Sequence, residues 1–301
     1  MKKQTKGWLI TAVALIAAGG LLFGGVMTVF SWDFTALSTR NLVTKECLIS
    51  ESFHSIYIDT STANVELVLS DSAAVTCREW ENETHTVSVV DGVLTITETD
   101  TRKWYQHIGI TVGSPSVTVY VPHFRGTMGN LTVKASTGTV TVPDNLAFEN
   151  VDITLSTGNI TYEADAAFID LRTTTGAVTV NNVMADRVNV SVTTGKTALS
   201  NVRCHVFTTT GDTGRVTLSD VIATRRMGIE RSTGDVVFDR CDTAVLNVTT
   251  STGDVTGTML TDKPIKVTTS TGGVQVPDSD KENGASTIHT STGDVDIRVA
   301  E

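Results

Sequence analysis

The chain repeats one short sequence motif (here called the phrase) nine times, and this repeat constrains the fold more than any other feature. Each copy reads serine or threonine, then threonine, then glycine, with a β-branched residue two positions later. A period near 20 residues is typical of stacked repeats, each of which is too small to bury its own hydrophobic face. The repeat glycines lie 16 to 23 residues apart, with a mean of about 19.4, at Gly138, Gly158, Gly176, Gly195, Gly211, Gly234, Gly253, Gly272 and Gly293.

Apolar residues recur at fixed distances from these glycines. They dominate the positions five and seven residues before the glycine and two and four residues after it. Alternation with period two on both sides indicates two strands per repeat, each with one face inward. The threonine directly before the glycine and the residue two positions after it are both assigned to the inward face. Because these positions are three residues apart, the alternation is interrupted at the glycine, which supplies the backbone freedom that a corner requires.

These columns predict an all-β, single-domain β-solenoid (β-helix) of about nine coils, with a period near 19–20 residues, over residues 123–301. Identical columns favour parallel stacking at the strand spacing of ~4.8 Å. An antiparallel meander or sandwich with a repeated hairpin is the alternative. Residues 51–122 are also rich in strand-forming residues but irregular, and they are predicted to form an N-terminal β-strand cap. This segment contains a degenerate copy of the phrase, with Ala63 in the place of glycine.

The N-terminus predicts a membrane segment. Residues 1–7 form a lysine-containing cytoplasmic tail, residues 8–30 a transmembrane signal anchor, and residues 31–50 a linker. An apolar run of about 23 residues spans roughly 34 Å as a helix, enough to cross a bilayer. A cleavable signal peptide is the competing interpretation, although its apolar region is usually shorter. The lysines predict a single-pass protein of the cytoplasmic membrane, N-terminus inside, with the β domain extracytoplasmic.

Charge limits the partners. The formal net charge is −10, and the three lysines before the apolar run make the remainder more acidic still. An acidic domain is poorly suited to nucleic acid or to anionic headgroups, so no nucleic-acid partner is predicted.

The sequence offers little catalytic chemistry. It shows no recurring cluster of catalytic side chains, so no catalytic residue, cofactor or metal is predicted. Asp212, Asp235 and Asp254 are the weak candidates for a metal site, because a column of carboxylates could bind a divalent cation. A role in completing turns is favoured for all three. Trp104 and Tyr105 share one loop and could stack on sugar rings.

The cysteines predict no disulfide between Cys204 and Cys241. Each occupies an apolar column of the repeat, Cys204 seven residues before Gly211 and Cys241 seven after Gly234. Buried free cysteine behaves as a small hydrophobic residue. Nearly two coils separate the pair, or roughly 8–10 Å along the stack, which exceeds the reach of a disulfide.

The order of parts resembles a known family. A lysine tail, one apolar segment and "DFTALST" precede "FHSIYIDTSTANVELVLSD", "DGVLTITE" and "VTVYVP", and tandem "STGDV" copies follow. This order is similar to that of the bacterial "putative adhesin" family, a domain of unknown function with β-strand repeats. The resemblance implies a membrane-anchored or secreted cell-envelope protein, linked in some relatives to envelope stress. It implies no catalytic residues.

The sequence therefore predicts a non-enzymatic, membrane-anchored extracytoplasmic protein with an adhesin-like, envelope-interaction or stress-sensing role. A cell-wall polymer or an envelope protein is the expected partner. A carbohydrate-binding or carbohydrate-active β-solenoid, using the loop of Trp104 and Tyr105, is the alternative.

Overall fold

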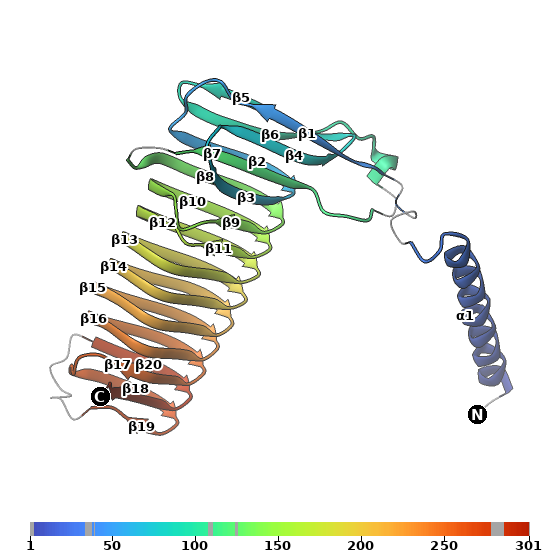
Figure 1. Cartoon of the computed structure of the whole chain (residues 1–301). Helices are drawn as coiled ribbons and strands as arrows, with labels where there is room; N and C mark the ends of the chain where they lie inside the picture. Colours follow the sequence, from blue (N-terminus) through green and yellow to red (C-terminus); the bar gives the residue numbers. More distant parts are fainter. Residues whose placement is uncertain are drawn as a thin grey trace.

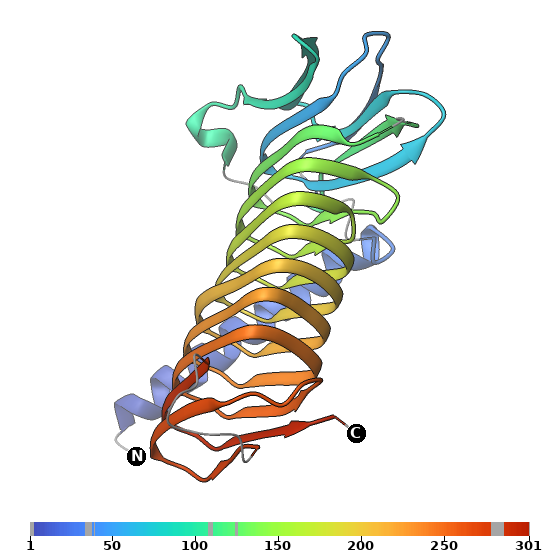
Figure 2. The ribbon, with the colours of Figure 1, turned by 90° about the vertical axis from the view of Figure 1, so that its left-hand side faces the viewer.

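The structure, a computed structural model, describes residues 3–33, 38, 40–107, 111–123, 126–277 and 286–300. One helix, α1 (Lys3–Val29), precedes a long stack of β-strands (Figure 1). The view in Figure 2 shows successive turns of the chain stacked into a rod. The predicted β-solenoid with one N-terminal apolar helix is confirmed.

Two sets of strands make up the stack. Those of the N-terminal part are β1 (Leu42–Leu48), β2 (Ser55–Thr62), β3 (Asn64–Ser70), β4 (Ala74–Trp80), β5 (Glu83–Val90), β6 (Val93–Asp100) and β7 (Ser116–Pro122), with the short 3₁₀ helix η2 (Trp104–His107) between the last two. The regular coils contain β8 (Met128–Thr137), β9 (Val140–Val142), β10 (Ala147–Thr157), β11 (Ile160–Tyr162), β12 (Asp165–Thr175), β13 (Val178–Thr194), β14 (Thr197–Thr213), β15 (Val216–Thr233), β16 (Val236–Thr252), β17 (Val255–Met259), β18 (Ile265–Thr271), β19 (Val274–Gln275), β20 (Ser286–Thr292) and β21 (Val295–Val299).

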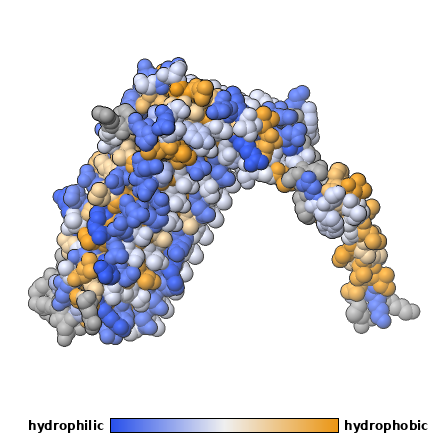
Figure 3. Space-filling view, viewed as in Figure 1, coloured by the Kyte–Doolittle hydropathy of each residue, from blue (hydrophilic) through white to orange (hydrophobic). Residues whose placement is uncertain are grey.

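The helix α1 is apolar along most of its length, and Figure 3 shows it as a largely hydrophobic surface. Its segment Thr5–Val29 is long and apolar enough to cross a membrane. A signal sequence near the N-terminus can meet the same criteria, so this helix is consistent with a signal anchor or a signal peptide.

The core is built from aligned columns. Parallel pairing places Val151 beside Leu131 and Ile169, and Ile153 beside Val133 and Leu171, one layer apart. Such inward positions are almost fully buried through the stack, so each layer completes the core of its neighbours. The threonine directly before each corner glycine is exposed, however, and not inward as expected. The inward series ends two residues earlier, and the corner is therefore wider than the sequence suggested.

The corner glycines also form a column, with one correction to the predicted register. Gly214, and not Gly211, lies between Gly195 and Gly234. Gly214 has φ 139°, as do the other corner glycines to within about 15°, whereas Gly211 is not in the left-handed region. A Cβ on Gly211 would overlap the guanidinium of Arg231. Glycine is therefore needed at this position to make room for a side chain, and not to form the corner. With Gly214 at the corner, the irregular intervals of 16 and 23 residues become 19 and 20.

Several coils have a second corner that the sequence analysis missed. Asn182, Asn201, Asp220 and Arg240 each follow a corner glycine by six residues and have φ between 51° and 56°. Asparagine and aspartate tolerate this left-handed conformation better than most residues. The Nδ2 of Asn201 also donates to Oδ1 of Asn182 at 3.0 Å, which links adjacent layers at this corner.

The order of layers differs from the order of the chain at both ends of the rod. β20 pairs with β16 on one side and β18 on the other (Figure 1). In the same layer, β21 lies between β17 and β19. Residues 286–300 therefore form the penultimate layer, and residues 265–275 the last. At the other end, β2 and β3 lie between β6 and β7 and the layer of β8 and β9. Ala63 occupies the glycine column there, as predicted, beneath Gly138.

A buried tyrosine provides a test of the core packing. Tyr162 is fully buried in the column that contains Phe238, and its hydroxyl has no hydrogen-bond partner among the residues that the structure describes. Burial raises the pKa of this phenol, and the nearby charge of Asp165 adds to the effect. Since an unsatisfied buried hydroxyl costs about 1–3 kcal/mol, we expect Tyr162→Phe to raise the melting temperature. Calorimetry of the two proteins would measure this, and a lower melting temperature would show that the hydroxyl has a partner.

The cysteines give a second test. Cys204 and Cys241 are both free and buried, as predicted. Cys204 pairs with Ala185 and Ala223, and not with the Val188 column as expected, because the corner is at Gly214. Burial raises the pKa of the Cys204 thiol to about 12 and that of Cys241 to about 11.

We therefore expect neither of these thiols to react with iodoacetamide until the protein is denatured. The half-buried Cys47 serves as the internal control and should react first. Peptide mapping after alkylation of native and denatured protein checks the order. A bridge between Cys204 and Cys241 under non-reducing conditions would contradict the layer register.

Candidate ligand-binding grooves

A polar groove crosses five consecutive layers of the rod. It lies on the outward face of β8, β10, β12, β13 and β14 and has a volume of about 620 Å³. Its outward side chains come from positions eight and six residues before each corner glycine. The spacing of 18 to 20 residues brings these positions into register, one layer above the next. The residues that line it are Asn130, Leu131, Thr132, Asn150, Val151, Asp152, Phe168, Ile169, Asp170, Arg187, Asn189 and Thr208.

Hydrogen bonds between layers orient the polar groups of this groove. The Nδ2 of Asn150 donates to Oδ1 of Asn130 at 2.9 Å. In the next layers, Asn189 donates from Nδ2 to Oδ1 of Asp170 at 3.2 Å and accepts from the hydroxyl of Thr208 at 2.8 Å. These ladders fix the side chains before any ligand arrives, which reduces the entropy cost of binding.

The two carboxylates that line the groove are paired. Arg172, which stands beside it, forms ion pairs with Asp170 and with Asp152, the latter at 3.5 Å. Partial burial nevertheless raises the pKa of Asp170 above its ordinary value, opposed by Arg172. The floor of the groove therefore offers hydrogen-bonding groups of both kinds without a large net charge.

Phe168 is the one aromatic ring that lines this groove, and it is 48% exposed. It stands in register between Asn150 and Arg187, so a polar side chain flanks it on each side along the stack. An exposed ring between an amide held by a hydrogen bond and a guanidinium group is a combination that binds a ligand with both apolar and hydroxyl-bearing faces.

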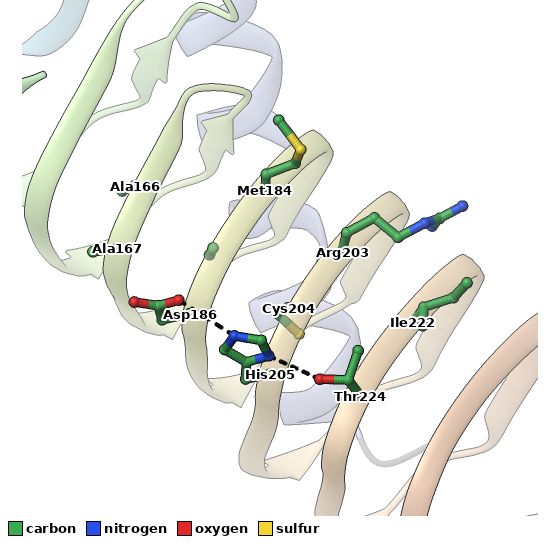
Figure 4. A pocket seen from close by; sticks show the side chains of 10 residues that line it. Ala166, Ala167, Met184, Asp186, Arg203, Cys204, His205, Ile222 and Thr224 are labelled. Atoms are coloured by element: carbon green, nitrogen blue, oxygen red, sulfur yellow. Dashed lines mark hydrogen bonds and ion pairs between the residues drawn. The ribbon is translucent and has the colours of Figure 1, made fainter. Parts of the chain in front are cut away.

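A second, more apolar groove lies next to the first, with a volume of about 460 Å³ (Figure 4). Ala166, Ala167, Met184, Ala185 and Ile222 contribute its apolar surface. Met184 is 63% exposed and projects away from the stack.

Three polar residues of this second groove form a line across successive layers. His205 lies between Asp186 and Thr224, with its Nε2 3.7 Å from Oδ1 of Asp186 and its Nδ1 2.8 Å from the Thr224 hydroxyl (Figure 4). The order of groups is that of a nucleophile, a base and an orienting acid. The side chains of His205 and Asp186 are more than half exposed, however, so water screens the pair. This arrangement is therefore a weak candidate for activating the Thr224 hydroxyl.

The structure separates the predicted carboxylate column. Asp235 and Asp254 follow corner glycines and are neighbours, and Asp294 is the next member. Asp212 lies outside this column, because its position is set by Gly214. The Oδ1 of Asp235 accepts the backbone N–H of Asp254 at 3.3 Å, and that of Asp254 accepts the N–H of Asp294 at 2.8 Å. These bonds fit the predicted turn role.

Arg215 further engages this column. Its guanidinium donates to Oδ2 of Asp235 at 2.7 Å, and this bond lowers the pKa of the carboxyl group. We therefore expect added calcium to leave the melting temperature of the protein unchanged.

The two aromatic residues proposed for sugar stacking differ from Trp80 in their surroundings. Trp104 and Tyr105 lie on η2 and are 79% and 52% exposed, with their rings edge to face at 6.0 Å. Trp80 is buried, with the guanidinium of Arg40 5.0 Å from its ring centroid. The rings of Trp104 and Tyr105 are thus accessible to a ligand, whereas the ring of Trp80 is not.

The two grooves were not predicted from the sequence. Their signal was present: asparagine and aspartate recur eight and six residues before the corner glycines at Asn130, Asn150, Asp152, Asp170 and Asn189. These columns are outward and variable, so they do not stand out beside the apolar ones. Phe168 is an apolar residue in an outward column, which is a more direct sign of a binding surface.

Comparison with known proteins places this fold in a family. The model of the Toastrack DUF4097 family matches residues 53–183 and 166–301. A search of curated proteins finds no match.

Solved structures with similar folds come from several bacteria. A "putative adhesin" from Bacteroides fragilis is 13% identical with a TM-score of 0.41, covering 86% of this chain and 97% of that one. A "putative lipid binding protein" from Parabacteroides distasonis is 14% identical with a TM-score of 0.46, covering 87% and 98%. A "putative cell adhesion protein" from Clostridium sporogenes is 9% identical with a TM-score of 0.34, covering 86% and 100%. Likenesses this distant say nothing of what this chain binds.

The family model, by contrast, matches the sequence itself over more than half of the chain. Its two ranges overlap and together include β2 to β21. The chain therefore belongs to the Toastrack DUF4097 family.

Proposed function

We propose that this protein is a non-enzymatic, membrane-anchored binding rod of the cell envelope that holds an uncharged glycan in its polar groove. The observation that carries the proposal is the groove of about 620 Å³ across five layers, in which Phe168 stands among oriented amide, carboxylate and guanidinium groups. An extended polymer suits this surface, because its units meet equivalent positions every ~4.8 Å.

The chemistry of the groove favours a sugar. Planar amide and carboxylate groups can each bond two neighbouring hydroxyls, and an aromatic ring packs on the apolar C–H face of a sugar. The net charge of −10 disfavours an acidic polymer. A protein ligand is the other outcome to be tested.

A glycan array probed with the full chain in detergent tests the proposal. We expect binding to a neutral glycan without turnover, and at least about tenfold weaker binding for Phe168→Ala, a loss of about 1.4 kcal/mol. Trp104→Ala is the matched control, since it removes an exposed ring on the alternative loop.

The variants distinguish the two sites. Loss of binding in Trp104→Ala, with binding by Phe168→Ala unaffected, would show that the glycan binds at η2 and not in the polar groove. Absence of glycan binding, together with capture of an envelope protein that depends on Phe168, would replace the glycan by a protein. Released sugar product would contradict a non-enzymatic role, and His205→Ala would then show whether the line of Asp186, His205 and Thr224 is responsible.

The anchored topology makes a separate prediction. If α1 stays uncleaved with its lysine end inside, protease added to intact protoplasts should digest the β-rich part and spare the helix. Immunoblotting with tags at either end would follow both parts. Recovery of a mature protein that begins near residue 32 would show that α1 is a cleaved signal sequence.

A further inference from the structure

Three side chains with metal-ligating atoms meet inside the N-terminal part, away from both grooves. Cys77 and Glu79 alternate on the inward face of β4, and His85 lies on β5 after the tight turn that joins the two strands. All three residues are buried, and their ligand atoms lie within 4.8 Å of one another. Sulfur, nitrogen and carboxylate oxygen are the donors that zinc combines in proteins.

The hydrogen bonds around His85 show where a cation is needed. The Thr60 hydroxyl donates its single proton to Oε2 of Glu98 at 2.7 Å. His85 Nε2, 3.1 Å from the same hydroxyl oxygen, must therefore be the donor in that contact. A neutral imidazole that carries its proton on Nε2 has a lone pair on Nδ1.

That lone pair points at another acceptor. His85 Nδ1 lies 3.0 Å from Oε2 of Glu79, which also accepts the backbone N–H of His85 at 2.6 Å. Two acceptors at this distance in a buried site need a positive centre between them. A proton satisfies the pair alone, whereas a metal ion would engage Cys77 as well.

We propose that Cys77 Sγ, the Glu79 carboxylate and His85 Nδ1 bind a zinc ion. Zinc–ligand bonds of about 2.0–2.3 Å place neighbouring tetrahedral donors roughly 3.3–3.7 Å apart. The present separations, 3.0 Å between Nδ1 and Oε2 and at most 4.8 Å overall, need shifts of about 1 Å or less. Binding releases the thiol proton and the proton between His85 and Glu79 to solvent.

The surroundings already contain the outer contacts that zinc sites use. A zinc-bound histidine usually donates its other N–H to an oxygen, which fixes the ring and increases its basicity. Here His85 Nε2 donates to Thr60, and Thr60 in turn donates to Glu98, whose side chain is 7% exposed. The metal would join β4 to β5 and so brace the end of the rod that the linker from α1 reaches.

Cobalt binding by the full chain in detergent, after treatment with a chelator, tests the site. One cobalt ion per chain should give a thiolate-to-cobalt charge-transfer band, and zinc should displace it and raise the melting temperature. We expect Cys77→Ser to abolish the band, and Glu79→Gln and Thr60→Val each to weaken zinc binding about 10- to 100-fold.

Cys241→Ser is the matched control, because it removes another buried thiol and should leave the band unchanged. A band that persists in Cys77→Ser, or that disappears in Cys241→Ser, overturns the assignment. Absence of the band from the unsubstituted chain also overturns the assignment. The proposal can therefore be refuted even if a variant fails to fold.

Discussion

Replacing Gly176 with alanine is expected to destabilise the rod by more than ~3 kcal/mol, because the new methyl group has no room. A Cβ at this position would overlap the carbonyl of Gly158 in the adjacent layer. Gly176 also has φ 146°, a conformation that alanine rarely adopts. The melting temperature should fall by roughly 6–12 °C, with hydrogen exchange increasing first in the layers on either side.

Gly273→Ala is the control for this experiment. Its Cβ would lie 3.6 Å from Oδ1 of Asp294, an ordinary contact, and its φ is outside the left-handed region. We expect little change in its melting temperature. If Gly176→Ala were equally harmless, the layers of Gly158 and Gly176 would have to separate more easily than the backbone hydrogen bond from Gly158 N–H to the carbonyl of Thr175, at 2.8 Å, suggests.

Arg231→Ala is expected to cost about 3–5 kcal/mol, because it leaves buried acceptors without donors and opens a cavity. The guanidinium donates to the carbonyl of Val192 at 2.8 Å and to the hydroxyls of Thr197 at 2.7 Å and Thr209 at 3.0 Å. It fills the space left by the missing side chain of Gly211. Burial lowers the pKa of Arg231 from its ordinary value, as expected for a cation with little access to water.

Arg226→Ala on the same strand provides the comparison, since Arg226 is exposed. Chemical denaturation of both variants would measure the difference in unfolding free energy. Equal stability of the two variants would show that Arg231 is not an internal strut of the rod. A large loss of stability for Arg231→Ala alone would explain why the adjacent coil contains two threonine–glycine pairs, at Gly211 and at Gly214.

The repeat predicted the fold well, and its failures have physical causes. In "TTTGDTG", both Gly211 and Gly214 follow a threonine, so the local phrase alone does not identify the corner. Even spacing would have selected Gly214, because a solenoid layer must close on its neighbours at each turn. Gly211 was misassigned because its small size serves the side chain of Arg231, a contact between layers that no local pattern reveals.

The candidate sites were less predictable than the core. Inward columns repeat because every layer has the same interior, whereas a groove depends on differences between layers, such as Phe168 among polar neighbours. The cluster of Cys77, Glu79 and His85 likewise depends on how one irregular hairpin folds over the stack. The Cys77–Glu79 alternation is visible in the sequence, but nothing near it marks His85 as its partner.

The exchanged order of the last two layers has a consequence for biosynthesis. Residues 265–275 leave the ribosome before residues 286–300, yet their place in the rod lies beyond them. Until residues 286–300 have been synthesised, both β16 and β18 lack their common partner β20. The last segment of the chain therefore joins two layers that are made before it. The end of the rod is complete only once residues 286–300 are in place.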